Sequence, residues 1–174
     1  QGRDALERMI PDEMADRKEE LIEACITVGR EMSWDMFRTE VELIPGVKRL
    51  FAAVGGRKIP MGVVTSTERS NIQRKLIPLA RHGIKGALAA VIAIEDAPRR
   101  KPAADPLIVC ADQLGVPPRT CLYAGDSHVD IRAGRAAGML TVGVLSGLDD
   151  RETLEAESPT LILESVADLI PFFS

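Results

Sequence analysis

The sequence predicts an α/β fold in which a small helical domain precedes a doubly wound parallel sheet. From Val47 onward, continuous apolar runs alternate with helix-like segments, which is typical of a parallel sheet covered on both faces. Residues 12–41 instead contain no proline, a single glycine and many charges of both signs. The length of 174 residues suits one core with a small appended domain and excludes a large multidomain enzyme.

The N-terminal region is expected to be helical. Apolar residues recur at helical spacing between Met14 and Val28, with charged residues between them. A helix start after Pro11 is favoured, because proline suits a first turn and the acidic residues that follow suit the positive end of the helix dipole. The segment Ile44-Pro45-Gly46 interrupts the pattern. We therefore expect a helical domain over 1–44 and an α/β core over 45–174.

The core elements follow in order along the chain. Strands are predicted over 59–64, 90–94, 120–123, 141–144 and 160–163. Helices are predicted over 47–56, 70–81, 105–114 and 130–137, and a last helix follows the final strand.

Composition excludes several classes of protein. The 22 basic and 26 acidic residues give a net charge of −4, which offers no basic surface for nucleic acid or an anionic membrane. Aromatic residues, at 3%, are too few for base stacking. No apolar run approaches the roughly 20 residues that span a bilayer, and the first residues lack a signal-peptide layout, so we expect a cytoplasmic protein. Cys25, Cys110 and Cys121, with only two histidines, favour reduced structural thiols over a disulfide framework or a zinc site.

Hydroxyl side chains follow the first predicted strand at Thr65-Ser66-Thr67. Ligands bind at the carboxyl ends of parallel strands, and hydroxyls with backbone N–H groups near a helix N-terminus form a phosphate cradle. Helix capping by Ser or Thr explains the same residues, and for this segment alone capping is the simpler interpretation.

A lysine opens a proline-stiffened loop at Lys101-Pro102. Such a lysine can be held as a point charge against a phosphate or a carboxylate. Its neighbours Arg99 and Arg100 are interpreted as a solvated basic loop. Asp105-Pro106 is interpreted as a helix cap followed by a first-turn proline.

Two carboxylates, Asp126 and Asp130, lie in the segment GDSHVD after the strand at 120–123. They suit Mg²⁺, which proteins hold with one or two carboxylates and several waters. Capping of the next helix explains Asp130 equally well, whereas it does not explain Asp126. Ser127, His128 and Asp130 are too close in sequence to form a hydrolase triad, and His128 is interpreted as a loop residue.

Together, Thr65, Lys101 and the GDSxxD segment closely resemble motifs two, three and four of the haloacid dehalogenase-like hydrolase superfamily. The GDSxxD form resembles the phosphoglycolate phosphatase-like branch of that superfamily. The segments IPGVKRLFAAV, DIRAGRAAGMLTVGV and TLILESVADLIPFF are also similar to family segments, so the resemblance covers essentially the whole chain. It implies a Rossmann-like core over 45–174 and part of a helical cap over 1–44.

The resemblance also implies a role for each candidate residue. Thr65, Ser66 and Lys101 would bind the phosphate, and Thr65 and Lys101 would be catalytic. Asp126 would bind Mg²⁺, and Asp130 would ligate the metal directly or orient a metal-bound water. Arg3 is either a substrate anchor or an exposed arginine at a helix start, and the second is the simpler interpretation.

The family's first motif, DxDGT, which supplies the aspartate nucleophile, is not found, because no Asp-x-Asp occurs in the sequence. We expect that this chain belongs to a longer protein; a natural, inactive truncation is the alternative. The complete protein is expected to hydrolyse a small phosphorylated metabolite with Mg²⁺, through an aspartyl-phosphate intermediate, as a monomer or homodimer. The 174-residue chain alone is expected to be inactive.

Two other functions stay open. One is a non-catalytic domain that binds phosphate for regulation. The other is a sugar-phosphate mutase of the same superfamily, against which Gly125 argues, because that branch typically has an acidic residue at this position.

The centre of the sheet is predicted to be interrupted. In this family the first strand lies between the strands at 59–64 and 120–123. Without it, both neighbours expose unpaired backbone groups, each at a cost of roughly 1–3 kcal/mol. We therefore expect a gap of about two strand spacings, roughly 9–10 Å, or a strand supplied by another chain. Direct pairing of the two strands would instead favour the binding domain.

Overall fold

The computed structural model describes residues 2–173, and the side chains of that range except residues 2–5 and 12. The chain divides into two compact units, Gln1–Val41 and Glu42–Ser174, which are described separately. The side chain of Arg3 lies outside the described residues, so its predicted choice of roles is not addressed. None of the helices within the described range is long and apolar enough to cross a membrane.

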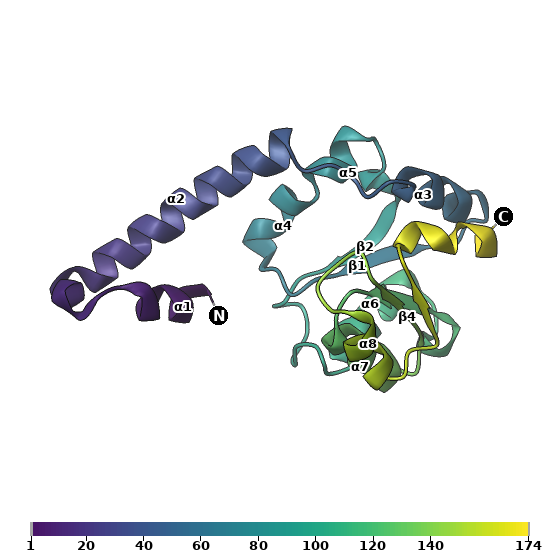
Figure 1. Ribbon diagram of the computed structural model, residues 1–174. Coiled ribbons are helices and arrows are strands. Elements are labelled where there is room, and N and C mark those ends of the chain that lie inside the picture. Colours follow the sequence, from purple (N-terminus) through teal and green to yellow (C-terminus); the bar gives the residue numbers. More distant parts are fainter. Residues whose placement is uncertain (1, 174) are drawn as a thin grey trace. The chain divides into compact units, whose positions relative to one another are not determined.

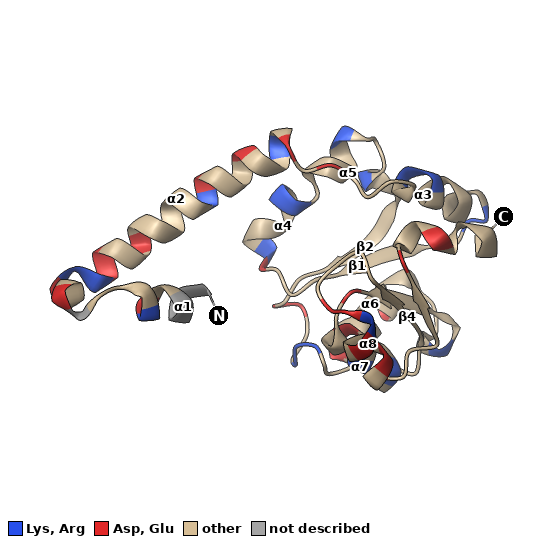
Figure 2. Ribbon diagram, viewed as in Figure 1, with Lys and Arg blue, Asp and Glu red and all other residues tan. Residues whose placement is uncertain are grey.

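The N-terminal unit is helical, as its spacing of apolar residues predicts. It consists of α1 (Gly2–Met9), a 3-10 segment η1 (Asp12–Arg17) and the long helix α2 (Lys18–Thr39). A helix does start after Pro11, as predicted, but it is the 3-10 segment η1, which is irregular at Met14, and the α-helix α2 begins only at Lys18. Acidic and basic residues occur along α2 (Figure 2).

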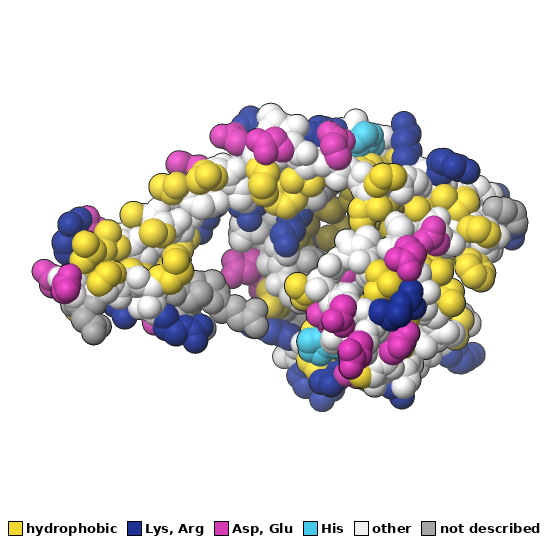
Figure 3. Space-filling model, viewed as in Figure 1, with side chains coloured by type: hydrophobic (Ala, Val, Ile, Leu, Met, Phe, Trp, Pro, Cys, Tyr) yellow, Lys and Arg dark blue, Asp and Glu magenta, His cyan; other side chains and the backbone are white. Residues whose placement is uncertain are grey.

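Exposed apolar side chains are a feature of helix α2. Ile22 is the buried residue of α2, whereas several large apolar side chains further along are exposed (Figure 3), namely Val28, Met32, Trp34 and Met36.

The second unit contains alternating strands and helices, which confirms the α/β prediction (Figure 1). The strands are β1 (Met61–Val64), β2 (Leu88–Ile92), β3 (Leu122–Gly125), β4 (Leu140–Val144) and β5 (Leu161–Leu163). The helices that match predictions are α3 (Val47–Gly56), α6 (Asp105–Leu114) and α7 (His128–Ala136). Short 3-10 turns, η2 (Lys85–Ala87) and η3 (Pro118–Thr120), precede β2 and β3.

Three helical segments differ from the predictions. The helix expected over 70–81 is two helices, α4 (Arg69–Lys75) and α5 (Ile77–Arg81), because Pro78 fits only the first turn of a new helix. A helix that was not predicted, α8 (Arg151–Ala156), begins where Asp150 accepts a hydrogen bond from the Thr153 N–H (2.9 Å). The last helix is a 3-10 helix, η4 (Val166–Phe173), with a proline inside it.

The strands form two separate parallel sheets. β1 pairs with β2, and β3, β4 and β5 pair in that order. Within residues 2–173, β1 and β3 therefore do not pair, which confirms the predicted interruption. A cavity of about 500 Å³ lies between them and is lined mainly by apolar side chains, among them Val63, Val64, Leu107, Cys110, Leu122 and Ala124.

Helices pack closely against the strands of both sheets. Helix α3 and η4 cover one face of β4 in a cluster of buried side chains, namely Leu50, Val54, Val142, Val144 and Leu169. Helix α7 lies on the three-stranded sheet at Gly134, where an added Cβ would be only 2.5 Å from Thr141 Cγ2. Cys110 is buried beside β2, and burial raises its thiol pKa to about 11, in line with its predicted structural role.

Candidate active site

Lys101 is the residue that joins the two sheets at their carboxyl ends. Its Nζ donates to Asp130 Oδ1 (2.7 Å), to the Tyr123 hydroxyl (3.2 Å) and, at 3.5 Å, to the carbonyl of Val64 at the end of β1. The Lys101 side chain is only 11% exposed and that of Asp130 only 7%. The structure thus brings two of the predicted site residues into a partly buried ion pair.

Both carboxylate oxygens of Asp130 accept hydrogen bonds from side chains. Oδ1 accepts from Lys101 and from the Tyr123 hydroxyl (2.9 Å), and Oδ2 accepts from the Ser127 hydroxyl (2.7 Å). Burial opposes the charge of this carboxylate, but the Lys101 ammonium and these hydrogen bonds outweigh burial, so the pKa of Asp130 lies below its usual range. Burial, together with the Asp130 charge, raises the pKa of Tyr123, so the phenol stays a protonated donor.

The Thr65-Ser66-Thr67 segment follows β1 directly, as predicted. The Thr65 hydroxyl accepts from the Thr67 N–H (3.2 Å) and donates to the Thr67 hydroxyl (3.0 Å). The cap residue of α4 is Glu68, which makes no side-chain cap hydrogen bond. The capping interpretation of these hydroxyls is therefore wrong.

Asp126 lies directly after β3 and is enclosed by the loop that follows β4. Its Oδ2 accepts from the Leu148 N–H (3.1 Å), and its carbonyl accepts from the Asp149 N–H (2.9 Å). An added Cβ on Gly147 would overlap the Asp126 carboxylate, so a side chain at position 147 would displace it. Gly147 is thus required for the close approach of this loop.

Hydrogen bonds at the start of α7 correct two predictions. His128 is the first residue of α7 and not a loop residue, and both its N–H and its Nδ1 lie 2.6 Å from Asp149 Oδ2. Ser127, not Asp130, is the cap of α7, since its hydroxyl accepts from the Asp130 N–H (3.4 Å).

The loop before α6 also differs from its interpretation. Asp105 does not cap α6, whose cap position is Ala104; instead it is the first helical residue. Its carboxylate accepts two hydrogen bonds from the Arg99 guanidinium (3.0 and 2.8 Å), while the Arg99 side chain stays largely exposed to solvent, as interpreted.

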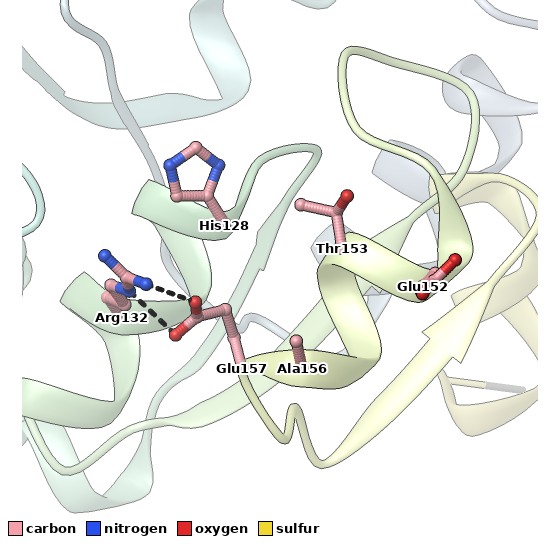
Figure 4. Close-up of a pocket in the computed structure, with 6 residues that line it drawn as sticks. All are labelled: His128, Arg132, Glu152, Thr153, Ala156 and Glu157. Carbon is pink, nitrogen blue, oxygen red and sulfur yellow. Dashed lines mark hydrogen bonds and ion pairs between the residues drawn. The ribbon is translucent and has the colours of Figure 1, made fainter.

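A second hollow lies on the outer side of α7 and α8 (Figure 4). Its charged pair, Arg132 and Glu157, already forms two hydrogen bonds (2.8 and 2.6 Å). His128 and Glu152 point away from that pair (Figure 4). None of the predicted site residues lines this hollow, so it does not belong to the candidate site.

Within the described part of the chain, no three His, Cys, Asp or Glu side chains gather closely enough to hold a metal ion by themselves. Mg²⁺ needs fewer protein ligands, because it keeps several waters and binds substrate phosphate oxygens. The oxygen donors of Asp126 fit such a hard cation. Its role as a metal ligand stays a prediction.

Two residues of this site escaped sequence reasoning. Tyr123 precedes the GDSHVD segment within an apolar strand and is indistinguishable there from a core residue. Gly147 lies 21 positions after Asp126, and its requirement follows from a loop contact that no local pattern signals.

The chain is similar in sequence to a known family of hydrolases. Residues 2–144 match the family model described as haloacid dehalogenase-like hydrolase. Phosphoglycolate phosphatase of Escherichia coli (strain K12) is 33% identical over 129 residues, which are 74% of this chain and 50% of that protein. The same-named enzyme of Synechococcus elongatus is 31% identical over 130 residues, 75% of this chain and 58% of that protein. The chain thus spans about half the length of the curated relatives it matches.

Solved structures share the fold. A predicted phosphoglycolate phosphatase from Haemophilus somnus superposes with a TM-score of 0.74 at 21% identity, covering 95% of this chain and 69% of that one. β-Phosphoglucomutase from Clostridium difficile superposes with a TM-score of 0.67 at 20% identity, covering 88% and 63%. At these identities the likeness concerns the fold alone. Because the family model matches residues 2–144, the chain belongs to the haloacid dehalogenase-like hydrolases.

Proposed function

We propose that this chain, completed by a strand that carries a carboxylate nucleophile, is a Mg²⁺-dependent hydrolase of a small phosphorylated metabolite. The observation that carries the proposal is the Lys101 ammonium, held between the end of β1 and Asp130 at the start of α7. A fixed positive charge at the carboxyl ends of parallel strands suits a bound phosphate and the charge of a transferring phosphoryl group. Kinship with phosphoglycolate phosphatases supports a phosphate ester as the substrate, phosphoglycolate included.

Each site residue has a role in this proposal. The Thr65 hydroxyl and the Ser66 N–H, which has no intramolecular acceptor within residues 2–173, bind phosphoryl oxygens. Lys101 neutralises charge on the phosphoryl group and the nucleophile. Asp126 holds Mg²⁺, which supplies further positive charge to the phosphate when bound. Asp130, whose two oxygens accept hydrogen bonds from Lys101, Tyr123 and Ser127, orients Lys101 and either ligates Mg²⁺ directly or orients a metal-bound water.

The cavity between β1 and β3 supports the location of the nucleophile. A strand running parallel to its two neighbours would satisfy the backbone groups at both sheet edges, and its carboxyl end would lie beside Lys101. An aspartate there would attack phosphorus as the bond to the leaving alcohol breaks, and water would then cleave the aspartyl-phosphate. The chain alone, without an Asp-x-Asp, would release no phosphate.

Gly125 supports hydrolysis over sugar-phosphate mutation. A Cβ at this position would overlap the Asp130 side chain, so the acidic residue typical of the mutase branch does not fit here.

The test is a phosphate-release screen of the protein extended by its upstream coding sequence. We expect Mg²⁺-dependent release from small phosphorylated metabolites, and loss of turnover by at least about 100-fold in Lys101→Met and in Asp126→Ala. Thr160→Ala, which removes a hydroxyl that accepts from the Thr141 N–H (3.1 Å) just before β5 and outside the cavity, serves as the control. Phosphate binding without release would support the regulatory domain, and an isomerised product without release would support the mutase.

A further inference from the structure

A buried hydroxyl that the proposed chemistry does not use lies among the site residues. Tyr123 on β3 donates from its hydroxyl to Asp130 Oδ1 (2.9 Å) and accepts from Lys101 Nζ (3.2 Å). Lys101 Nζ is also 6.0 Å from the centroid of the Tyr123 ring. We infer that Tyr123 is a positioning residue for phosphoryl transfer, whose hydroxyl fixes where the Lys101 ammonium lies; this inference rests on the proposed function.

Lys101 needs such a partner because of its chemistry. A lysine ammonium is a point charge on a flexible stem, with three donors and no preferred plane. Of its three acceptors, the carbonyl of Val64 is at 3.5 Å, the limit of a hydrogen bond, which leaves Asp130 and Tyr123 as the close ones. If Asp130 were the only close acceptor, the ammonium could rotate about that single hydrogen bond. The second hydrogen bond, to Tyr123, fixes its position.

Tyr123 is itself held from behind. An added Cβ on Gly134 would be 3.3 Å from Tyr123 Cδ1, so the ring lies against the backbone of α7. One side of the phenol is thus fixed by β3 and α7, and its hydroxyl end meets Lys101 and Asp130. Preorganised charges stabilise a transition state better than mobile ones, since no reorganisation is needed during reaction.

The kinetic test uses Tyr123→Phe in the extended protein, because this change removes the hydroxyl and keeps the ring. We expect kcat to fall about tenfold with KM changed less than about twofold, since Lys101 acts on charge that grows during transfer. Thr141→Val is the matched control. It removes a buried hydroxyl on β4, beside Tyr123 in the sheet, that accepts from the Thr160 N–H (3.3 Å) and not from Lys101 or Tyr123, so kcat should stay unchanged.

A double-mutant cycle separates positioning from a structural role. If Tyr123 acts through Lys101, Tyr123→Phe should not lower the residual kcat of Lys101→Met any further. An additive loss in the double variant, or an unchanged kcat in Tyr123→Phe alone, would overturn the inference.

A second measurement needs no turnover. In the 174-residue chain, ¹⁵N NMR of the Lys101 ammonium should show faster proton exchange with water in Tyr123→Phe than in the wild type or in Thr141→Val. Equal exchange in the three proteins would refute the positioning role. Absence of phosphate release by the extended wild-type protein would count against the proposed function only, because the NMR comparison does not depend on it.

Discussion

Replacing Gly134 by alanine tests how closely α7 packs against β4. The new Cβ would lie 2.5 Å from Thr141 Cγ2, at least about 1 Å inside the ordinary carbon–carbon contact distance. Thr141 is 1% exposed, β-branched and paired through its backbone with Thr160, so it cannot give way easily. Overpacking costs about 1–3 kcal/mol, whereas alanine in a helix gains about 1 kcal/mol over glycine. We therefore expect a net change between about zero and a destabilisation of about 2 kcal/mol, in contrast to the gain expected at an uncrowded helix position.

Urea unfolding followed by circular dichroism measures this difference. Gly55→Ala is the matched control, because Gly55 lies in α3 with nothing within 4 Å of an added Cβ, and this change should stabilise the protein by up to about 1 kcal/mol. Thr141→Ser removes the obstructing methyl group, so the pair Gly134→Ala/Thr141→Ser should be more stable than the sum of the single changes. A gain in stability for Gly134→Ala as large as that of Gly55→Ala, or strict additivity in the pair, would refute this account of the packing.

Three further predictions concern the site itself. Gly147→Ala should displace the Asp126 carboxylate and weaken Mg²⁺ binding about tenfold in a calorimetric titration, and an unchanged dissociation constant would contradict the role of this loop. Ser127→Ala should lower stability by about 1 kcal/mol, because the cap of α7 is lost; an unaltered melting temperature argues against the cap. Since the pKa of Asp130 is lowered by folding, its contribution to stability is present above the unfolded pKa of about 3.9 and is lost as pH falls through the lower folded pKa. Urea unfolding at pH values from neutral to acid should show that the free energy of unfolding depends less on pH in Asp130→Asn than in the wild type. An equal dependence of this free energy on pH in the two proteins would exclude the linkage.

Local patterns in the sequence were sufficient for most of the elements. The limits of α3 and α6 match their predicted ranges, because a glycine pair or a proline in the first turn marks those ends chemically. Pro78 also signals the break between α4 and α5, which the single predicted helix does not include. Helix α8 was not predicted because it is short and has few apolar residues, as a loop does. The separation of β1 from β3 was predicted from motif order, and no segment of residues 2–173 supplies a strand between them.

The sequence by itself determined the residue types of the site and the strand ends on which they lie, because strands and their following turns are set by near neighbours. Only the tertiary structure decided which of these residues touch. Lys101 reaches Asp130 and Tyr123 across 29 and 22 positions of chain, and Asp130 is engaged on both oxygens. Such contacts depend on how α7 packs on its sheet, which is a property of shapes brought together by folding and has no local signal. The same folding gives the two aspartates of one short segment different partners, because Asp126 accepts from the loop that follows β4 and Asp130 accepts from Lys101.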